Sequence, residues 1–155
     1  MKRQSSVQAL QKILKTKVPL TKAMGVRVLS CSARGGVTFS LPLKPNRNHK
    51  NTAFGGTLVA GQALACWAWI CEILEENQID AEVVVQHQKA DFILPVKRDF
   101  KVVAKPASAA EIKRFLQTLL RHEKARMQVT ACVLLQGRIA SQYIGEYVAI
   151  RARRE

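Results

Sequence analysis

The stretch that decides the fold is residues 54–71, FGGTLVAGQALACWAWIC. It begins with an aromatic residue and two glycines and then continues without a single charged residue. A helix that has no polar face must be buried on all sides or lie in a membrane. Glycines in its first turn leave backbone N–H groups bare, so that a ligand can approach them. The stretch therefore predicts a central helix covered by a sheet, with a binding site at its N-terminus.

A transmembrane helix is the alternative interpretation of this stretch. Its length is 18 residues, and a spanning helix needs about 17–25. The first third is only weakly apolar because it contains Gly55, Gly56, Thr57, Gly61 and Gln62. The rest of the chain alternates between apolar and polar residues, as the strands of a soluble protein do. We therefore expect no membrane span.

Length and composition predict one globular domain over residues 1–155. The chain begins with basic residues and has no apolar signal-peptide core. Its four cysteines are scattered and form neither a CxxC pair nor a Cys/His cluster. We therefore expect no metal site and no disulfide framework. Free thiols without an export signal predict a cytoplasmic protein.

The net charge of +14 predicts attraction to anions. Nucleic acid, an anionic lipid or a phosphate-bearing cofactor would each satisfy it, and a solvated basic surface is the plain alternative. Basic residues concentrate at 12–22, 44–50, 121–126 and 151–154. The chain shows no helix-turn-helix signature, zinc pattern or RNP-like aromatic stripe, which makes nucleic-acid binding the weaker interpretation.

The remaining pattern predicts elements in the order α-β-β-α-β-β-α-β-β. Strands are expected over residues 24–32, 37–43, 81–94, 100–104, 125–135 and 139–150, and a Ser108-x-x-Glu111 capping box opens the last helix. Six strands and one wholly apolar helix indicate an α+β domain, in which a single antiparallel sheet wraps around the central helix. A ferredoxin-like split fold is the alternative, but its helices are amphipathic and pack on one face of the sheet.

The segment 48–58, NHKNTAFGGTL, gives the chain a family resemblance. It resembles the N-x-x-x-T-x-F-G-G-[ST]-L motif of hotdog-fold thioesterases, and above all the bacterial thioesterase domain found alone or behind an acetyltransferase domain. Residues 92–100, FILPVKRDF, resemble the strand-turn-strand segment of those domains. The resemblance covers essentially the whole chain. It implies a hotdog fold, with a six-stranded antiparallel sheet wrapped around a long helix.

The resemblance also implies a function and an assembly. The substrate would be an acyl group on coenzyme A or acyl carrier protein, and the reaction would be hydrolysis of its thioester without a metal or organic cofactor. A homodimer, often a dimer of dimers, would form by edge-to-edge joining of the sheets through residues 81–94, with active sites at the subunit interface. A binding module that holds acyl-CoA or an acyl carrier without hydrolysis is the alternative, and a basic nucleic-acid-binding protein is a weaker one.

Thioester hydrolysis needs a polarised carbonyl and an oriented water. N–H groups at a helix N-terminus polarise a carbonyl, so Gly56 is the expected donor. The neighbouring residues Phe54, Gly55 and Thr57 are expected to contact the substrate. Asn48, which matches an asparagine of the family motif, and Gln62, a lone amide on the apolar helix, are expected to hold the water. The alternatives are that Asn48 only forms a turn in the polar loop and that Gln62 only makes a structural hydrogen bond.

The chain departs from the related phenylacetyl-type hotdog thioesterases at two positions. Those enzymes have His-Gly-Gly where this chain has Phe54 before its glycines. They also carry an Asp or Glu about seven residues after the second glycine, where this chain has Ala63. Asp91, which shares a strand face with His87 and Lys89, is the candidate to supply the missing carboxylate from the other subunit. A polar residue on an interface strand is the alternative interpretation of Asp91.

Overall fold

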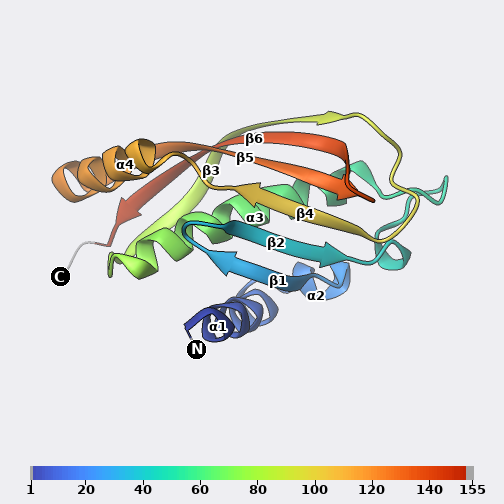
Figure 1. Ribbon diagram of the computed structural model, residues 1–155, viewed down its shortest axis with the longest axis horizontal. Coiled ribbons are helices and arrows are strands. Elements are labelled where there is room, and N and C mark those ends of the chain that lie inside the picture. The colour runs from blue at the N-terminus through green and yellow to red at the C-terminus, as the bar shows by residue number, and fades with distance from the viewer. Residues whose placement is uncertain (1, 153–155) are drawn as a thin grey trace.

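A computed structural model shows a curved sheet that covers one long helix (Figure 1). It describes residues 2–152, with side chains from residue 6 onward. The helices are α1 (Lys2–Lys17), α2 (Leu20–Met24), the 3-10 helix η1 (Lys44–Asn46), α3 (Gly55–Glu76) and α4 (Ala109–His122). The strands are β1 (Arg27–Ser32), β2 (Gly36–Leu41), β3 (Ala81–Phe92), β4 (Phe100–Lys105), β5 (Lys124–Leu135) and β6 (Arg138–Arg151).

The strands form one six-stranded sheet in the order β1-β2-β4-β5-β6-β3. Every pair of neighbours is antiparallel. The two edges are therefore β1 and β3, and β3 pairs with β6 along its whole length, from Ala81 opposite Arg151 to Phe92 opposite Ser141. This arrangement confirms the predicted α+β class and the single antiparallel sheet around a central helix.

The helix α3 lies against the concave face of the sheet and contacts all six strands. Trp69 is fully buried, and its indole Nε1 donates a hydrogen bond of 2.8 Å to the carbonyl of Ala33 in the β1–β2 turn. Gly61 lets β4 approach, because a Cβ at this position would lie 3.3 Å from Val102 Cγ2. By length and composition α3 is the one described helix that could cross a membrane, but it serves as the core helix, with 56% of its apolar window buried.

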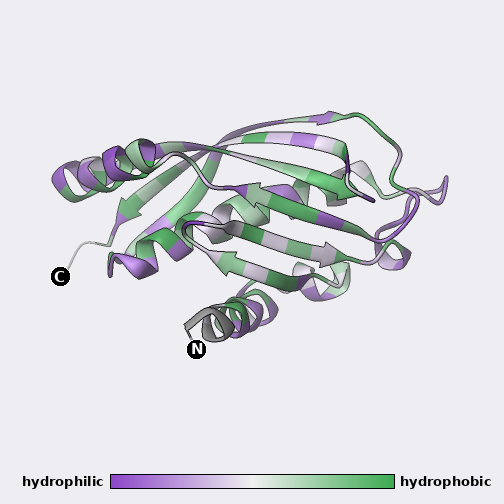
Figure 2. Ribbon diagram, viewed as in Figure 1, coloured by the Kyte–Doolittle hydropathy of each residue, from purple (hydrophilic) through white to green (hydrophobic). Residues whose placement is uncertain are grey.

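The flanking helices are amphipathic, as Figure 2 shows by the mixture of hydrophilic and hydrophobic residues along them. The helix α1 packs against β1, and α4 packs against β5 through Phe115 and Leu119. The predicted capping box at the start of α4 is present, since Ser108 Oγ accepts from Glu111 N and Glu111 Oε2 accepts from Ser108 N.

Three strand boundaries differ from the sequence prediction by two residues or more, and one of them is the end of β3, at Phe92 instead of residue 94. The predicted strand at residue 24 begins instead at Arg27, because Leu20–Met24 form α2, and Gly25 with φ 70 ends that helix. The predicted strand over 37–43 ends at Leu41, because Pro42 has no N–H for the sheet and the chain then turns into η1.

We predict that Trp69→Phe lowers the free energy of unfolding by about 1–3 kcal/mol, because it leaves the Ala33 carbonyl without its donor in the core. Urea denaturation followed by far-UV circular dichroism measures this. Trp67→Phe is the matched control, since Trp67 is only half-buried and its Nε1 donates a longer bond of 3.2 Å to Val83 O. Equal losses from the two variants would contradict the prediction.

Candidate functional site

The first turn of α3 presents two free backbone N–H groups. Phe54 is the N-cap, and its carbonyl accepts hydrogen bonds from Thr57 N at 3.0 Å and Leu58 N at 3.2 Å. No side chain caps the helix, and no acceptor among the described residues meets the N–H groups of Gly55 and Gly56. These groups lie at the positive end of the helix dipole, so they are suited to bind a carbonyl oxygen or an oxyanion.

Two aromatic rings stand directly beside these glycines. A Cβ on Gly55 would lie 3.4 Å from Phe92 Cζ, and one on Gly56 would lie 2.4 Å from Phe54 Cε1. Both rings are 58% exposed, and Ile93 next to them is 51% exposed. The sequence-predicted residues Phe54, Gly55 and Gly56 are thus brought together, and Phe92 and Ile93 add an apolar wall that sequence reasoning did not assign to the site.

Asn48 closes the loop that leads into α3. Its Oδ1 accepts from Lys50 N at 2.9 Å and Thr52 N at 3.2 Å, and its Nδ2 donates to Thr52 Oγ1 at 2.9 Å. Among the described residues only the second Nδ2–H lacks a partner, so Asn48 can offer one donor to a water or substrate while its oxygen holds the loop.

Asn46 anchors the same loop and was missed by sequence reasoning. It is 3% exposed, and its Nδ2 donates 2.8 Å bonds to the carbonyls of Met24 and Pro42. Its own carbonyl accepts from Phe54 N at 2.7 Å. Asn46 therefore fixes the residue from which α3 starts. No local sequence signal indicates this role. The partners of Asn46 are backbone atoms, and no sequence pattern near Asn46 predicts where those atoms lie.

Gln62 is fully buried between α3 and β6. Its Nε2 donates to Leu58 O at 3.0 Å and to Ser141 Oγ at 3.2 Å. Its Oε1 is buried and meets no donor among the described residues, which makes it a position for an internal water. The sequence leaves a structural hydrogen bond and the holding of a water both open for Gln62. The structure shows hydrogen bonds that link the helix to the sheet, and a role in holding the water stays a prediction.

Polar groups that the sequence prediction did not include lie beside Ala63, the position of the missing carboxylate. Tyr147 Oη donates to Ala63 O at 2.7 Å, and Tyr143 Oη lies 2.9 Å from Tyr147 Oη. Burial raises the pKa of both tyrosines, so both hydroxyls stay protonated at neutral pH. Gly145 between them lets the rings meet, since a Cβ there would lie 2.5 Å from Tyr147 Cε2. The Y-x-G-x-Y spacing on a strand, which puts both rings on one face, is the signal that could have found them.

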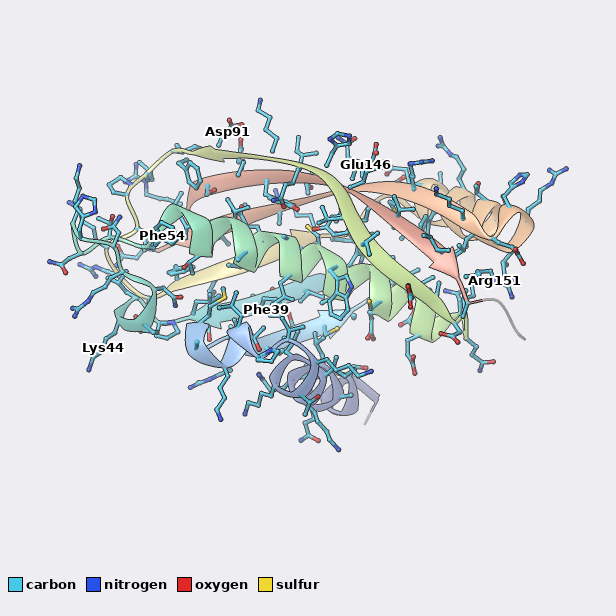
Figure 3. All side chains as sticks on the ribbon, turned by 180° about the vertical axis from the view of Figure 1, so that it is seen from behind. Phe39, Lys44, Phe54, Asp91, Glu146 and Arg151 are labelled. Carbon is cyan, nitrogen blue, oxygen red and sulfur yellow. The ribbon has the colours of Figure 1, made fainter. Side chains whose placement is uncertain are left out.

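Asp91 lies on the outer face of the sheet, away from α3. It pairs with Gln142 in the register of β6 and approaches Lys89 Nζ at 3.9 Å. Figure 3 shows its side chain on the far side of β3 from Phe54. Within one chain the structure therefore does not bring Asp91 to the first turn of α3.

Basic residues surround a hollow of about 890 Å³ at the end of the molecule where α3 begins. Its walls include Lys44, Arg47, Lys97 and Arg98, together with the acidic Asp99. Arg151 does not contribute here, because it lies at the opposite end of α3 from Lys44 (Figure 3). Arg153 and Arg154 lie outside the described residues.

The cysteines offer no nucleophile near this turn. Burial raises the pKa of Cys66 to about 12 and that of Cys71 to about 12, so both thiols are protonated at neutral pH. Within the described part of the chain, His, Cys, Asp and Glu side chains form no group of three that could hold a metal ion.

Comparisons with known proteins agree with this architecture. Residues 7–151 match the family model described as "Putative thioesterase (yiiD_Cterm)". A protein of unknown function from Chlorobaculum tepidum TLS has a TM-score of 0.88 at 23% identity, over 94% of this chain and 94% of its own. A putative thioesterase from Shewanella oneidensis has a TM-score of 0.84 at 22% identity, over 95% and 99% of the two chains. The comparison with curated proteins gives no match. The predicted hotdog fold and family resemblance are confirmed.

We predict that Asn46→Ala lowers the free energy of unfolding by about 2–4 kcal/mol, because two carbonyls are left buried without their donor. Asn48→Ala, the matched control, removes bonds from a half-exposed loop, and we expect a loss of about 1 kcal/mol. Thermal unfolding and urea titration of both variants measure the difference. A larger loss for Asn48→Ala would contradict the assignment of Asn46 as the anchor.

Proposed function

Because the chain belongs to the family of putative thioesterases, we propose that it hydrolyses acyl thioesters of coenzyme A or acyl carrier protein. The observation that carries this proposal is the pair of free N–H groups at Gly55 and Gly56, which lie beside an apolar wall and a basic hollow. An acyl thioester has three matching parts: a polar carbonyl, an apolar chain, and a phosphate-bearing carrier.

The carbonyl would be polarised at the first turn of α3. Gly56 N–H, aided by the helix dipole, donates to the thioester oxygen and holds the oxyanion that forms when water attacks. Thr57 and Gly55 line the same turn, and the rings of Phe54 and Phe92 exclude solvent from it. Asn48 contributes through its remaining Nδ2–H and by fixing the loop. The reaction uses water alone and needs no cofactor.

The carrier would bind along the basic hollow. Coenzyme A carries phosphates at its nucleotide end, and the phosphopantetheine of a carrier protein is attached through one phosphate. Lys44, Arg47, Lys97 and Arg98 offer four positive charges against the single negative charge of Asp99. The hollow therefore offers positive charge to a polyanion, a short distance from the N–H groups of the first turn of α3.

We further propose that two copies pair along β3 to form a homodimer, which can pair again as a dimer of dimers. This strand is an open edge of 12 residues, and an unpaired edge is a template for another strand. It carries large exposed apolar residues, namely Val84, Val85 and Phe92. A partner would cover Val85 and Phe92, which lie on the helix-facing side of the strand, together with the half-buried side of α3 around Ala63 and Trp67. Asp91 would then lie at this interface.

A binding module without catalysis is the second candidate, because Ala63 stands where related enzymes place a carboxylate. Tight binding of an acyl-CoA without release of free thiol would establish it.

A steeply salt-dependent affinity for DNA or RNA, retained in the presence of coenzyme A, would instead support nucleic-acid binding. The cytoplasmic location remains a prediction from the sequence.

We predict that the protein releases free thiol from some members of an acyl-CoA series that runs from acetyl-CoA to palmitoyl-CoA. We expect Gly56→Pro to lower kcat on these substrates by about 100–1000-fold. Proline is tolerated in the first turn of a helix but has no N–H. Gly56→Ala is the matched control, because it keeps the N–H and displaces only the exposed ring of Phe54. The proposal fails if the folded protein hydrolyses no acyl-CoA or acyl-carrier thioester.

We predict that Val85→Glu converts a dimer into a 17.3 kDa monomer. Val85 lies opposite Tyr147 on the helix-facing side of β3 and is 44% exposed. The partner subunit would therefore bury the new charge of the glutamate. Val84→Glu, on the outer face of the same strand, is the control and should remain a dimer. Light scattering after size exclusion distinguishes the two masses. A wild-type monomer would refute the pairing.

A further inference from the structure

Charge is divided unevenly along this chain. The first 71 residues contain eleven of the 25 Lys and Arg residues and none of the 11 Asp and Glu residues. They therefore carry +11 of the net charge of +14. Beyond residue 71 the acidic residues offset most of the positive charge. The elements formed by the first residues thus decide where the protein displays its excess charge.

The helices α1 and α2 display this charge at one edge of the molecule. The helix α1 packs on the edge strand β1 and contacts α2. Figure 1 shows both helices beside β1, at the opposite edge of the sheet from β3. Four lysines are exposed here, and no carboxylate among the described residues forms an ion pair with any of them. We call them the lysine surface: Lys12, Lys15, Lys17 and Lys22.

Gln11 fixes α1 to the edge strand. Its Oε1 accepts from Val28 N at 2.8 Å and its Nε2 donates to Val26 O at 3.1 Å, as a neighbouring strand would. Leu10 and Leu14 are buried from the same helix. A helix that covers a strand edge protects it from pairing with another chain. The lysine surface is therefore a fixed part of the fold and does not lie on an open strand edge.

Exposed apolar side chains accompany these lysines. Leu20, between Lys17 and Lys22 in the sequence, is 60% exposed, more than any other large hydrophobic residue in the described part of the chain. Ile13 is 39% exposed. A hollow of about 490 Å³ between α1 and β1 combines charge and apolar surface in the same way, since its walls include Val7, Val28, Lys12 and Lys15. The lysine surface thus joins positive charge to apolar groups that the described chain leaves uncovered.

We propose that the lysine surface docks the protein onto a bilayer that contains anionic lipids. Lysines near a membrane are attracted to its anionic headgroups. Apolar side chains between them enter the boundary between headgroups and acyl chains, and Leu20 and Ile13 would make this second contact. Docking of this kind needs no membrane-spanning segment. The inference goes beyond the proposed thioesterase function and does not depend on it.

Other anionic partners fit this surface less well. Proteins that bind single-stranded nucleic acid stack its bases on aromatic side chains, and the first 38 residues contain no aromatic residue. Arginine is the residue that recognises phosphates and guanine with a fixed geometry, whereas every cation of α1 and α2 from residue 6 onward is a lysine. Lysine is also depleted at protein–protein interfaces. A bilayer needs neither stacking nor a fixed hydrogen-bond geometry.

Docking would bring the candidate site close to the bilayer. Asn46 Nδ2 donates to the carbonyl of Met24, the last residue of α2, and the carbonyl of Asn46 accepts from Phe54 N, at the start of α3. A single residue therefore connects α2 to the first turn of α3. Long acyl chains partition into bilayers, so a docked protein would meet long-chain acyl thioesters at the surface where they gather.

A solvated basic surface is the plain alternative. It predicts a weak attraction to anionic vesicles that follows the net charge, whichever cations are removed. Docking through the lysine surface predicts instead that the position of the removed charge decides the affinity. Variants of equal net charge therefore distinguish the two interpretations.

The first test measures sedimentation of the wild type with vesicles of phosphatidylcholine, with and without phosphatidylglycerol. We expect binding only to the vesicles that contain phosphatidylglycerol. We expect it to weaken as salt rises from about 0.1 to 1 M, because the Debye length falls from about 10 to about 3 Å. Absence of binding to the anionic vesicles overturns the proposal, and equal binding to both kinds of vesicle overturns the role of the lysines.

The second test compares two triple variants of equal net charge. One reverses three cations of the lysine surface, namely Lys12→Glu, Lys15→Glu and Lys22→Glu. The control reverses three exposed cations of α4, namely Lys113→Glu, Arg114→Glu and Arg121→Glu. We expect the first variant to lose at least about 100-fold in affinity for anionic vesicles, at about fivefold for each lysine, and the control less than about 10-fold. Equal losses overturn the proposal. Circular dichroism verifies the fold, and the corresponding Gln variants replace a Glu variant that does not fold.

The apolar contact is tested at constant charge. We expect Leu20→Ser to weaken binding to anionic vesicles by about 3–10-fold, because a large apolar side chain no longer leaves water. Leu120→Ser is the matched control, since Leu120 is 51% exposed on α4 and should bind like the wild type. Equal effects of the two substitutions overturn the insertion of Leu20.

Other occupants of the surface give different outcomes. A DNA duplex or an acidic carrier protein that binds more tightly than the vesicles, and loses its affinity in the lysine-surface variant, overturns the proposal in favour of that partner. A lysine-surface variant with a smaller mass in light scattering assigns the surface to a second copy and also overturns it. None of these measurements depends on thioester hydrolysis, so their failure is distinct from a failure of the proposed function.

Discussion

The constraint on which the structure depends is that α3 has no polar face. A helix of this kind has to be covered on every side, and the six strands of the sheet cover most of it. The side toward the open edge of β3 is left only half-buried, at Ala63 and Trp67 among others. One chain therefore does not cover its own apolar helix completely. The apolar pattern of the helix thus accounts for the sheet, and the side that the sheet leaves open supports the proposed pairing with a second copy.

The same helix explains why the site lies where it does. A buried helix brings its N–H groups to the surface only at its first turn, and here no side chain caps that turn. Asn46 determines where the helix starts, and the glycines allow aromatic rings to pack beside the bare N–H groups. The electrostatic part of the site is thus a property of backbone geometry, and it needs no ionisable residue.

Periodicity and turn chemistry predicted the fold because those signals are local. The apolar run at 54–71, the alternation in the strands and the capping box at Ser108 each depend on neighbours in sequence. The strand boundaries near Gly25 and Pro42 and the end of β3 were misplaced by two or three residues, and the other strand boundaries agree to within one residue. The site could be predicted at the first turn of α3, where the motif is contiguous. The anchoring role of Asn46 could not, because the carbonyl of Met24 and the N–H of Phe54 that it bonds come from other elements. The partners of Gln62 could not be predicted either, because a lone amide on an apolar helix does not show which strand it faces.

The absence of a carboxylate at Ala63 is consistent with thioester chemistry. A thiol has a pKa near 8.5, so the thiolate leaves readily without an acid to protonate it in advance. The thioester carbonyl then needs polarisation and a well-placed water more than it needs a strong base. The backbone N–H groups at the first turn of α3 would supply the first requirement. The leaving group of an ester or an amide is a much stronger base, so the proposed reaction would favour thioesters through the chemistry of their leaving group.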